Sequence, residues 1–227
     1  MSKKAGSLGK IGESLDPARM RDEMERHVPE EAIMQSSGQF ILMNRKGFDM
    51  WLEGHEIIRD IELIQNHHTY IPNYDTFDGE NHFKLLESMK RSHLKRGFSD
   101  IAQNITTYPD GMIAVCRPIN TTPAGIKGAN SRGICIEHIG DFDKGKDEVS
   151  DEHKKTILWI NAVLCKKLGL EVSTDTIVYH HWYDLKTGKR KNGEGVTKSC
   201  PGTAFFGGNK VEDAEKNFIP LIKNEKV

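Results

Sequence analysis

Long apolar segments are absent from this sequence of 227 residues. No run approaches the roughly 18 consecutive apolar residues of a membrane-spanning helix. The first seven residues are basic, but no apolar segment follows them, so the sequence predicts no secretory signal peptide. The expectation is a protein made in the cytoplasm, without a membrane span.

An excess of charge of either sign is also missing. The 32 Lys and Arg residues are balanced by 33 Asp and Glu residues, and the formal net charge is −1. Because both signs are spread along the chain, nothing indicates a nucleic-acid-binding surface, and no nucleic-acid partner is expected. Internal repeats and low-complexity segments are absent as well, so a repeat architecture is not predicted.

Cysteine is scarce, and its placement argues against a disulfide framework. The four cysteines are widely separated: Cys116, Cys135, Cys165 and Cys200. The first three lie in apolar contexts typical of strands or helices, which predicts buried thiols. Cys200 differs, because it lies among loop residues.

Two His-His pairs are the most informative feature that is present. His67-His68 and His180-His181 each follow a run of residues typical of a β-strand. Two strand ends and the Cys200 loop can meet at one edge of a sheet. Since a catalytic zinc ion usually takes three His, Cys or carboxylate ligands and leaves a fourth position open, these residues predict a zinc site in a hydrolase.

Other interpretations of these residues remain open. A His-His pair alone is usually incidental, and a single cysteine is more often an ordinary buried thiol. A structural zinc ion, closed by a fourth ligand such as His138 or His181, is the main alternative to a catalytic one. The wide separation of the two pairs argues against a local zinc finger, whose ligands come in close pairs.

Glu137 is the candidate for proton transfer. In the strand predicted at residues 133–139, it shares a face with Cys135, whereas the neighbouring isoleucines point to the other face. A charge between apolar strand positions is costly unless paired or solvated, which favours an open site. A carboxylate there would take a proton from water and return it to a departing amine, while Lys198 would stabilise a developing oxyanion. The alternatives are a solvated edge glutamate and an ordinary surface lysine.

Four short motifs make the sequence resemble a known family. They are Gln65-Asn66-His67-His68-Thr69, Gly97-Phe98-Ser99-Asp100-Ile101, Gly133-Ile134-Cys135-Ile136-Glu137, and His180 followed by Lys198-Ser199-Cys200-Pro201-Gly202. In this order they resemble the zinc-dependent N-acetylmuramoyl-L-alanine amidases of the peptidoglycan-recognition superfamily, which includes phage endolysins. The resemblance covers about residues 61–222. It implies cleavage of the amide between N-acetylmuramic acid and the first L-alanine of the stem peptide.

The resemblance also implies roles for individual residues. The first histidine of each pair and the cysteine correspond to the family's zinc ligands, so the implied set is His67, His180 and Cys200. Glu137 corresponds to a strand glutamate that many members use in catalysis. Lys198 corresponds to the lysine two positions before the third ligand, which implies a catalytic role.

The sequence departs from the family's pattern at two places. Where many relatives have a tyrosine that is often given a catalytic part, this chain has Gln103, which shifts the expected proton transfer onto Glu137. Gln103 is then expected among the residues that contact substrate. The segment between His180 and Lys198 is also longer than in many relatives, and it is basic and glycine-rich. It is interpreted either as a loop that folds over the substrate or as a solvated connection.

A polar, glycine-rich stretch at residues 121–132 precedes the Glu137 strand. Its backbone donors, together with Asn130 and Arg132, suit a sugar–peptide ligand that carries carboxylates. The resemblance implies that this loop lines the cleft. We therefore predict that Asn130 and Arg132 bind substrate, and a plain connecting loop is the alternative.

The order of the predicted elements indicates an α/β fold. Strands alternate with helices from about residue 61, which predicts a mixed central β-sheet flanked by helices on both faces. Periodic apolar residues predict helices at about residues 80–96, 151–168 and 210–219, the last ended by Pro220.

The chain is expected to divide near residue 60. Residues 1–60 would form an N-terminal extension with a mobile start, a short helix after Asp16-Pro17 and a strand at residues 39–43. Residues 48–51 would form a link. Residues 61–227 would form the zinc amidase domain.

The predicted function is hydrolysis of peptidoglycan by a zinc amidase, as in a phage- or prophage-type lysin with antimicrobial action. The same enzyme would also serve in wall remodelling or as an effector delivered between bacteria. A protein of another class, a module that binds muropeptide without hydrolysis, is the alternative. Cys200 favours the enzyme, because recognition members of the superfamily commonly lack this ligand. Action on a cell wall would require release or delivery from the cytoplasm.

Overall fold

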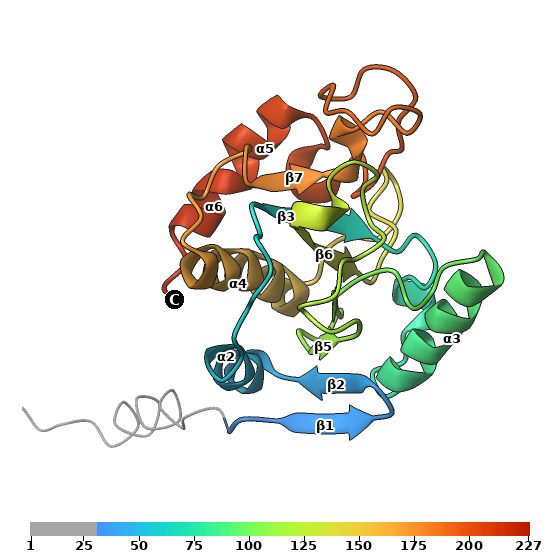
Figure 1. Cartoon of the computed structure of the whole chain (residues 1–227), viewed down its shortest axis with the longest axis vertical. Helices are drawn as coiled ribbons and strands as arrows, with labels where there is room; N and C mark the ends of the chain where they lie inside the picture. The colour runs from blue at the N-terminus through green and yellow to red at the C-terminus, as the bar shows by residue number, and fades with distance from the viewer. Residues whose placement is uncertain (1–30) are drawn as a thin grey trace, which may run out of the picture. The chain divides into compact units, whose positions relative to one another are not determined.

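A mixed β-sheet organises the chain in the computed structural model, which describes residues 31–227 (Figure 1). The strands of this part, in spatial order, are β1 (Met34–Ser37), β2 (Phe40–Met43), β5 (Ile113–Val115), β4 (Ile105–Thr107), β6 (Gly133–His138), β3 (Leu63–His68) and β7 (Ile177–Tyr179). The pairs β3–β6, β3–β7 and β4–β6 are parallel, and the other three pairs are antiparallel. The mixed sheet is therefore confirmed. The mobile start and the short helix expected after Asp16-Pro17 lie outside the described residues.

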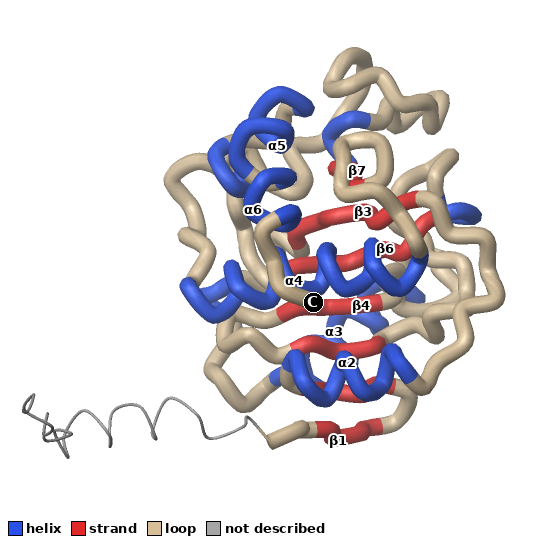
Figure 2. Tube along the Cα trace, turned by 90° about the vertical axis from the view of Figure 1, so that its left-hand side faces the viewer, coloured by secondary structure: helices blue, strands red, loops and turns tan. Residues whose placement is uncertain are grey.

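Helices cover both faces of the sheet, as predicted. One face carries α2 (Arg45–Glu53), α4 (Asp151–Leu168), α5 (Val211–Asn217) and α6 (Ile219–Lys223), and the other carries α3 (His82–Lys95). Figure 2 shows α2 and α4 in front of the strands and α3 behind them. In the described part of the chain, none of the helices combines the length and the apolar character that a membrane crossing requires.

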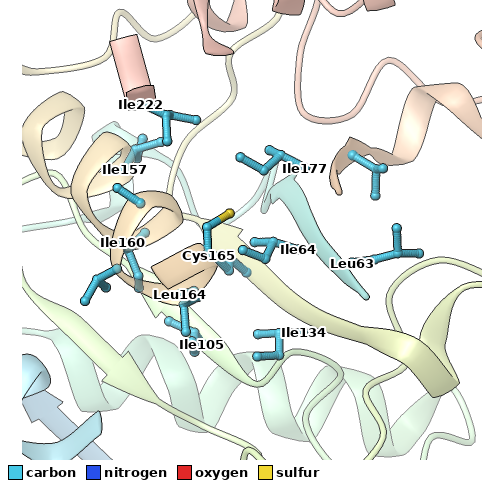
Figure 3. Close-up of a cluster of buried hydrophobic side chains, with 14 of the residues drawn as sticks. Leu63, Ile64, Ile105, Ile134, Ile157, Ile160, Leu164, Cys165, Ile177 and Ile222 are labelled. Atoms are coloured by element: carbon cyan, nitrogen blue, oxygen red, sulfur yellow. The ribbon is translucent and has the colours of Figure 1, made fainter. Parts of the chain in front are cut away.

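The larger core lies between the sheet and α4. Figure 3 shows Ile64, Ile134 and Ile177 of three neighbouring strands beside Ile157 and Ile160 of the helix. All five side chains are fully buried. Since burial of such a side chain contributes about 1.5–3 kcal/mol, this layer holds the parallel strands together.

Helix α4 begins and ends at the residues that the sequence predicts. The Ser150 hydroxyl accepts a hydrogen bond from the backbone N–H of His153 at 3.2 Å, and acidic residues occupy the first turn. Gly169 ends the helix with φ 66°, a left-handed conformation that a residue with a Cβ rarely adopts.

A chain of buried hydrogen bonds crosses this same face of the sheet. The side-chain amides of Asn66 and Asn161 bond reciprocally, both at 2.9 Å. His138 bonds Asn66 at 3.0 Å and the Thr107 hydroxyl at 2.7 Å, and that hydroxyl also bonds His153 at 2.7 Å. The chain therefore links β3, β6 and β4 to α4.

All four cysteines are free thiols and are buried. This confirms the prediction that Cys116, Cys135 and Cys165 are core thiols. The buried face that β6 turns away from α4 carries Cys135, and the helix itself carries Cys165.

The N-terminal boundary differs from the expectation. The compact unit runs from Ala32 to Val227, so residues 32–60 belong to the same unit as the strands that follow. The reason is that β2 pairs with β5 inside the sheet, and that the Arg59 guanidinium donates hydrogen bonds to carbonyls between residues 119 and 133. An extension ending at residue 60 is therefore corrected.

Two local expectations also need correction. Residues 48–51, expected as a link, lie in α2, which the Asn44 side chain caps by accepting a hydrogen bond from Gly47 N–H at 2.9 Å. Pro220 does not end the last helix but lies in the first turn of α6. A proline is tolerated there because a first-turn N–H has no partner within the helix.

Candidate metal centre and cleft

The parallel pairing of β3 and β7 brings the two histidine pairs together. Asn66 pairs with Tyr179, so His67 and His180 follow at the same end of adjacent strands. Cys200 reaches this end from a loop whose carbonyl accepts a hydrogen bond from the His181 backbone N–H at 2.8 Å. Three residues from distant parts of the chain therefore meet at the edge of the sheet.

The three side chains have the spacing of a metal site. His67 Nδ1 lies 3.2 Å from His180 Nδ1 and 3.5 Å from Cys200 Sγ, and all three ligand atoms lie within 4.8 Å of one another. Tetrahedral zinc, with bonds of about 2.1 Å to nitrogen and about 2.3 Å to sulfur, would hold such atoms roughly 3.4–3.6 Å apart. The residues present fit a zinc ion.

Burial sets the protonation of these groups. It lowers the pKa of His67 well below its usual value, with added repulsion from His180 and Lys198. It lowers the pKa of His180 to about 4 and raises the pKa of the Cys200 thiol. Both imidazoles are thus neutral near pH 7 and keep a nitrogen lone pair for a metal ion, whereas the thiol must lose its proton on binding.

The backbone closes over the far side of His67 at Gly125. A Cβ at this position would lie 3.1 Å from His67 Nε2 and 2.5 Å from Gln65 Oε1, so only glycine fits without a shift. His67 Nε2 is buried, and no hydrogen-bond partner for it exists among the described residues. The ring is therefore enclosed on this side, and Nδ1 is the nitrogen that faces Cys200.

Glu137 and Lys198 line the same cleft, whose volume is about 600 Å³. Glu137 pairs with His67 in the sheet register, which puts both side chains on one face. Burial raises the pKa of Glu137 to about 8, against the opposing pull of the Lys198 and Arg96 cations. Lys198 is exposed at the cleft.

Residues 58–203, more than half of the chain, match the N-acetylmuramoyl-L-alanine amidase family. The chain belongs to this family. The amidase fold is shared with Drosophila PGRP-LB, at 19% identity and a TM-score of 0.53 over 71% of this chain and 84% of that one. Drosophila PGRP-SA gives 19% identity and a TM-score of 0.53 over 71% and 82%. The amidase LysC from Clostridium intestinale URNW gives 21% identity and 0.47 over 70% and 85%. Among curated proteins, no sequence matches.

Three residues of the amidase domain that were expected to bind substrate do not line the cleft. Gln103 is fully buried and donates to the Thr106 hydroxyl at 2.9 Å. The Asn130 side chain accepts a hydrogen bond from Gly125 N–H at 2.9 Å, and Arg132 forms an ion pair with Glu62 on the surface. Their side chains are engaged in holding loops and strands of the amidase.

The alternative fourth ligands are also engaged elsewhere. His138 lies on the α4 face of the sheet, bonded to Asn66 and Thr107. His181 Nδ1 bonds the Lys198 carbonyl at 2.7 Å and so holds the loop that carries Cys200. Neither residue belongs to the groups of metal-binding side chains in the described part of the amidase.

The basic segment after His181 does not fold over the cleft of the amidase. The Asp184 carboxylate accepts hydrogen bonds from the backbone N–H groups of Thr187 and Val196, which fixes the loop. Arg190 stacks on the Trp182 ring, 5.1 Å from its centroid. Because no residue of this segment lines the cleft, the positions agree with the interpretation as a connection.

The sequence did not reveal that α3 forms a wall of the cleft. This wall comprises Leu85, Ser88, Met89, Ser92, His93 and Arg96. Their separations of three, four, seven, eight and eleven positions from Leu85 are those of one helix face. The polar continuation of that face, from Ser88 to Arg96, is the signal that could have identified it. The opposite rim includes Tyr70 and Ile71, which are exposed.

Proposed function

We propose that the protein is a zinc-dependent amidase that hydrolyses the bond between N-acetylmuramic acid and L-alanine in peptidoglycan. The observation that carries this proposal is the convergence of His67, His180 and Cys200 in one cleft with Glu137 and Lys198. Family membership over residues 58–203 supports it independently.

Zinc is the ion that suits this set of donors. Two imidazole nitrogens and a thiolate are typical zinc ligands, whereas magnesium and calcium prefer oxygen. When bound by three protein ligands with an open position, zinc supplies a nucleophile by lowering the pKa of a water molecule to about 7.

Glu137 is the group to which we assign proton transfer. As a carboxylate it would take a proton from the attacking water, and as an acid it would give that proton to the departing amine nitrogen. The pKa of about 8 lies close to neutral pH, so both forms are accessible during a catalytic cycle. A pKa near the working pH is the condition under which one group serves both as base and as acid.

Lys198 is assigned to charge stabilisation. Its ammonium lies at the cleft, and its carbonyl is held by His181 Nδ1 at 2.7 Å, so its backbone is fixed next to Cys200. As the amide carbonyl is attacked, its oxygen gains negative charge, and a cation already positioned there would stabilise that charge.

One observation favours a second candidate function, the binding of muropeptide without hydrolysis. Gln103 is fully buried, so it contributes nothing to the cleft in place of the tyrosine that many relatives have. Hydrolysis would then depend on Glu137 alone for proton transfer. The two functions differ in their products and are separable by experiment.

The deciding experiment incubates the zinc-supplemented protein with purified sacculi and measures free stem peptide with an L-alanine amino terminus. Release by the wild type, and its loss in Glu137→Gln with unchanged binding to sacculi, would support the amidase. Binding without release by either protein would support recognition alone.

We place the activity in a lysin of the phage type, which would act on the cell wall after release from the cytoplasm. A wall-remodelling enzyme or an effector delivered between bacteria would use the same chemistry. Expression with and without a holin in a susceptible host distinguishes the first role, since a phage-type lysin kills its host only when it can leave the cytoplasm.

A further inference from the structure

Arg96 is a cation without a counterion at the end of the α3 wall. It is exposed, it lines the cleft, and it forms no ion pair with any described residue. Its guanidinium lies over the Phe98 ring, 5.1 Å from the centroid. Stacking on an aromatic face restrains the guanidinium and leaves its N–H groups available for a planar anion.

His93 stands beside this cation and offers a neutral donor. Its Nδ1 accepts a hydrogen bond from the backbone N–H of Ala102 at 3.0 Å, so in the neutral ring the proton is on Nε2. Burial, with added repulsion from Arg96, lowers the pKa of His93 and keeps the ring neutral. The ring centroid of Phe98 lies 5.4 Å from that of His93, so the one phenyl ring contacts both groups.

The charges that line the cleft are unbalanced. Arg96 and Lys198 are the cations, and Glu137 is the one carboxylate among the lining residues. The positive charge of Arg96 lowers the pKa of both Glu137 and His93, which indicates that it faces the interior of the cleft. A cleft with excess positive charge on two sides suits a ligand that carries a carboxylate beyond the bond to be cleaved.

We propose that Arg96 and His93 form a carboxylate-binding subsite, which makes the protein select stem peptides with a free carboxylate over amidated ones. The inference rests on the proposed function and names a substrate class for the same cleft. A carboxylate accepts two parallel hydrogen bonds from a guanidinium. A carboxamide has one acceptor oxygen and turns an NH2 donor toward the other N–H group, and it carries no charge.

The test uses synthetic muramoyl peptides that differ only in one carboxylate or carboxamide. One pair differs at the α-carboxylate of the second stem residue, and another pair at the side-chain carboxylate of the third. The wild type is expected to show a kcat/KM about 10- to 100-fold higher for the acid of one pair, the range for a charged hydrogen bond, and that pair identifies the carboxylate. Equal rates on both members of both pairs would overturn the proposal.

Arg96→Gln should abolish the preference by lowering kcat/KM for the acid to the level of the amide, while the rate on the amide stays unchanged. Arg96→Lys should retain part of the preference, because it keeps the charge but loses the two-pronged geometry. Arg91→Gln is the matched control, since Arg91 is exposed on the same helix and does not line the cleft. A loss in Arg91→Gln as large as in Arg96→Gln would also overturn the proposal.

Binding separates this inference from the proposed hydrolysis. Calorimetric titration of the same peptides into Glu137→Gln measures selection without turnover. If the wild type cleaves none of the peptides but the Glu137→Gln protein prefers the acid, and Arg96→Gln in that background removes the preference, hydrolysis fails and the subsite stands. Equal affinities for acid and amide would remove the subsite, whatever the turnover.

Discussion

The Nδ1 atoms of His67 and His180 lie 3.2 Å apart, although 113 positions separate the residues in the chain. The contact follows from the sheet, because the parallel register that pairs Asn66 with Tyr179 places the next residue of each strand at the same edge. Any metal held here depends on that register, since a one-residue slip would turn one of the histidines to the other face.

The first prediction concerns metal content. The purified protein should contain about one zinc per chain, as a site with three protein ligands implies. Cys200→Ser should lower the zinc affinity sharply, because a thiolate ligand is lost. Cys165→Ala removes a buried thiol on the α4 face and should leave zinc content unchanged. Metal analysis checks all three proteins, and full occupancy in a His67→Ala, Cys200→Ser double variant would exclude this site.

The second prediction concerns Glu137. Glu137→Gln keeps the size of the side chain but removes the base, so turnover of sacculi should fall by roughly 10²–10⁴-fold, the typical contribution of a positioned base. Zinc content should not change. Glu62→Gln, at an exposed position before β3, is the control and should retain full turnover. Loss of zinc from Glu137→Gln would instead identify Glu137 as a ligand.

The third prediction tests whether residues 32–60 belong to the folded unit. The Arg59 guanidinium donates to the carbonyls of Ile119, Asn130 and Gly133 at 3.0–3.1 Å. Arg59→Ala should lower the free energy of unfolding by about 1.5–3 kcal/mol, the range for hydrogen bonds to a charged group. Urea denaturation measures it. Lys46→Ala, at an exposed position in α2, should change stability by no more than about 0.5 kcal/mol, and an equally small effect of Arg59→Ala would argue against the corrected boundary.

The fourth prediction concerns acid stability. Burial lowers the pKa of His153 to about 3, from 6.5 for the free side chain. Between these two values the unfolded chain binds a proton here that the folded protein does not. Stability is therefore lost as pH falls below about 6.5, by up to about 1.4 kcal/mol per pH unit from this residue.

His153→Gln should be less stable than the wild type at pH 7, because bonds to Thr107 and Tyr74 are altered. Its stability should nevertheless decline less steeply between pH 6.5 and 4.5. Urea denaturation of the chelator-treated proteins measures both slopes without the pH dependence of metal binding. Identical slopes would show that His153 does not cause the acid sensitivity.

The proposed ligands could be located from the sequence because each depends on local pattern. A histidine pair after a β-like run marks the end of a strand, and parallel strands bring such ends to one edge. The alternation of side chains in residues 133–138 likewise predicted that Glu137 and Cys135 share a face, and the structure has them so. The helix at residues 151–168 was also predictable, since its cap and its apolar spacing are local.

What the sequence did not indicate depends on contacts between distant segments. Gln103 is polar and follows a cleft-lining segment, but Thr106, three residues later, receives its amide N–H inside the core. The cleft role of Arg96 requires knowing which face of α3 turns toward the sheet edge. The edge strand β1 is fully exposed, so it has no apolar alternation to reveal it.

The burial of all four thiols has a practical consequence for fluorescence studies. A cysteine-free background, the usual starting point for maleimide labelling, would require removal of Cys200 and with it a proposed zinc ligand. The native chain does not need one, because a bulky dye cannot reach buried sulfur. Arg91→Cys would then present the single reactive thiol on the outer side of α3, and a dye there would report occupancy of the cleft in an otherwise unaltered enzyme.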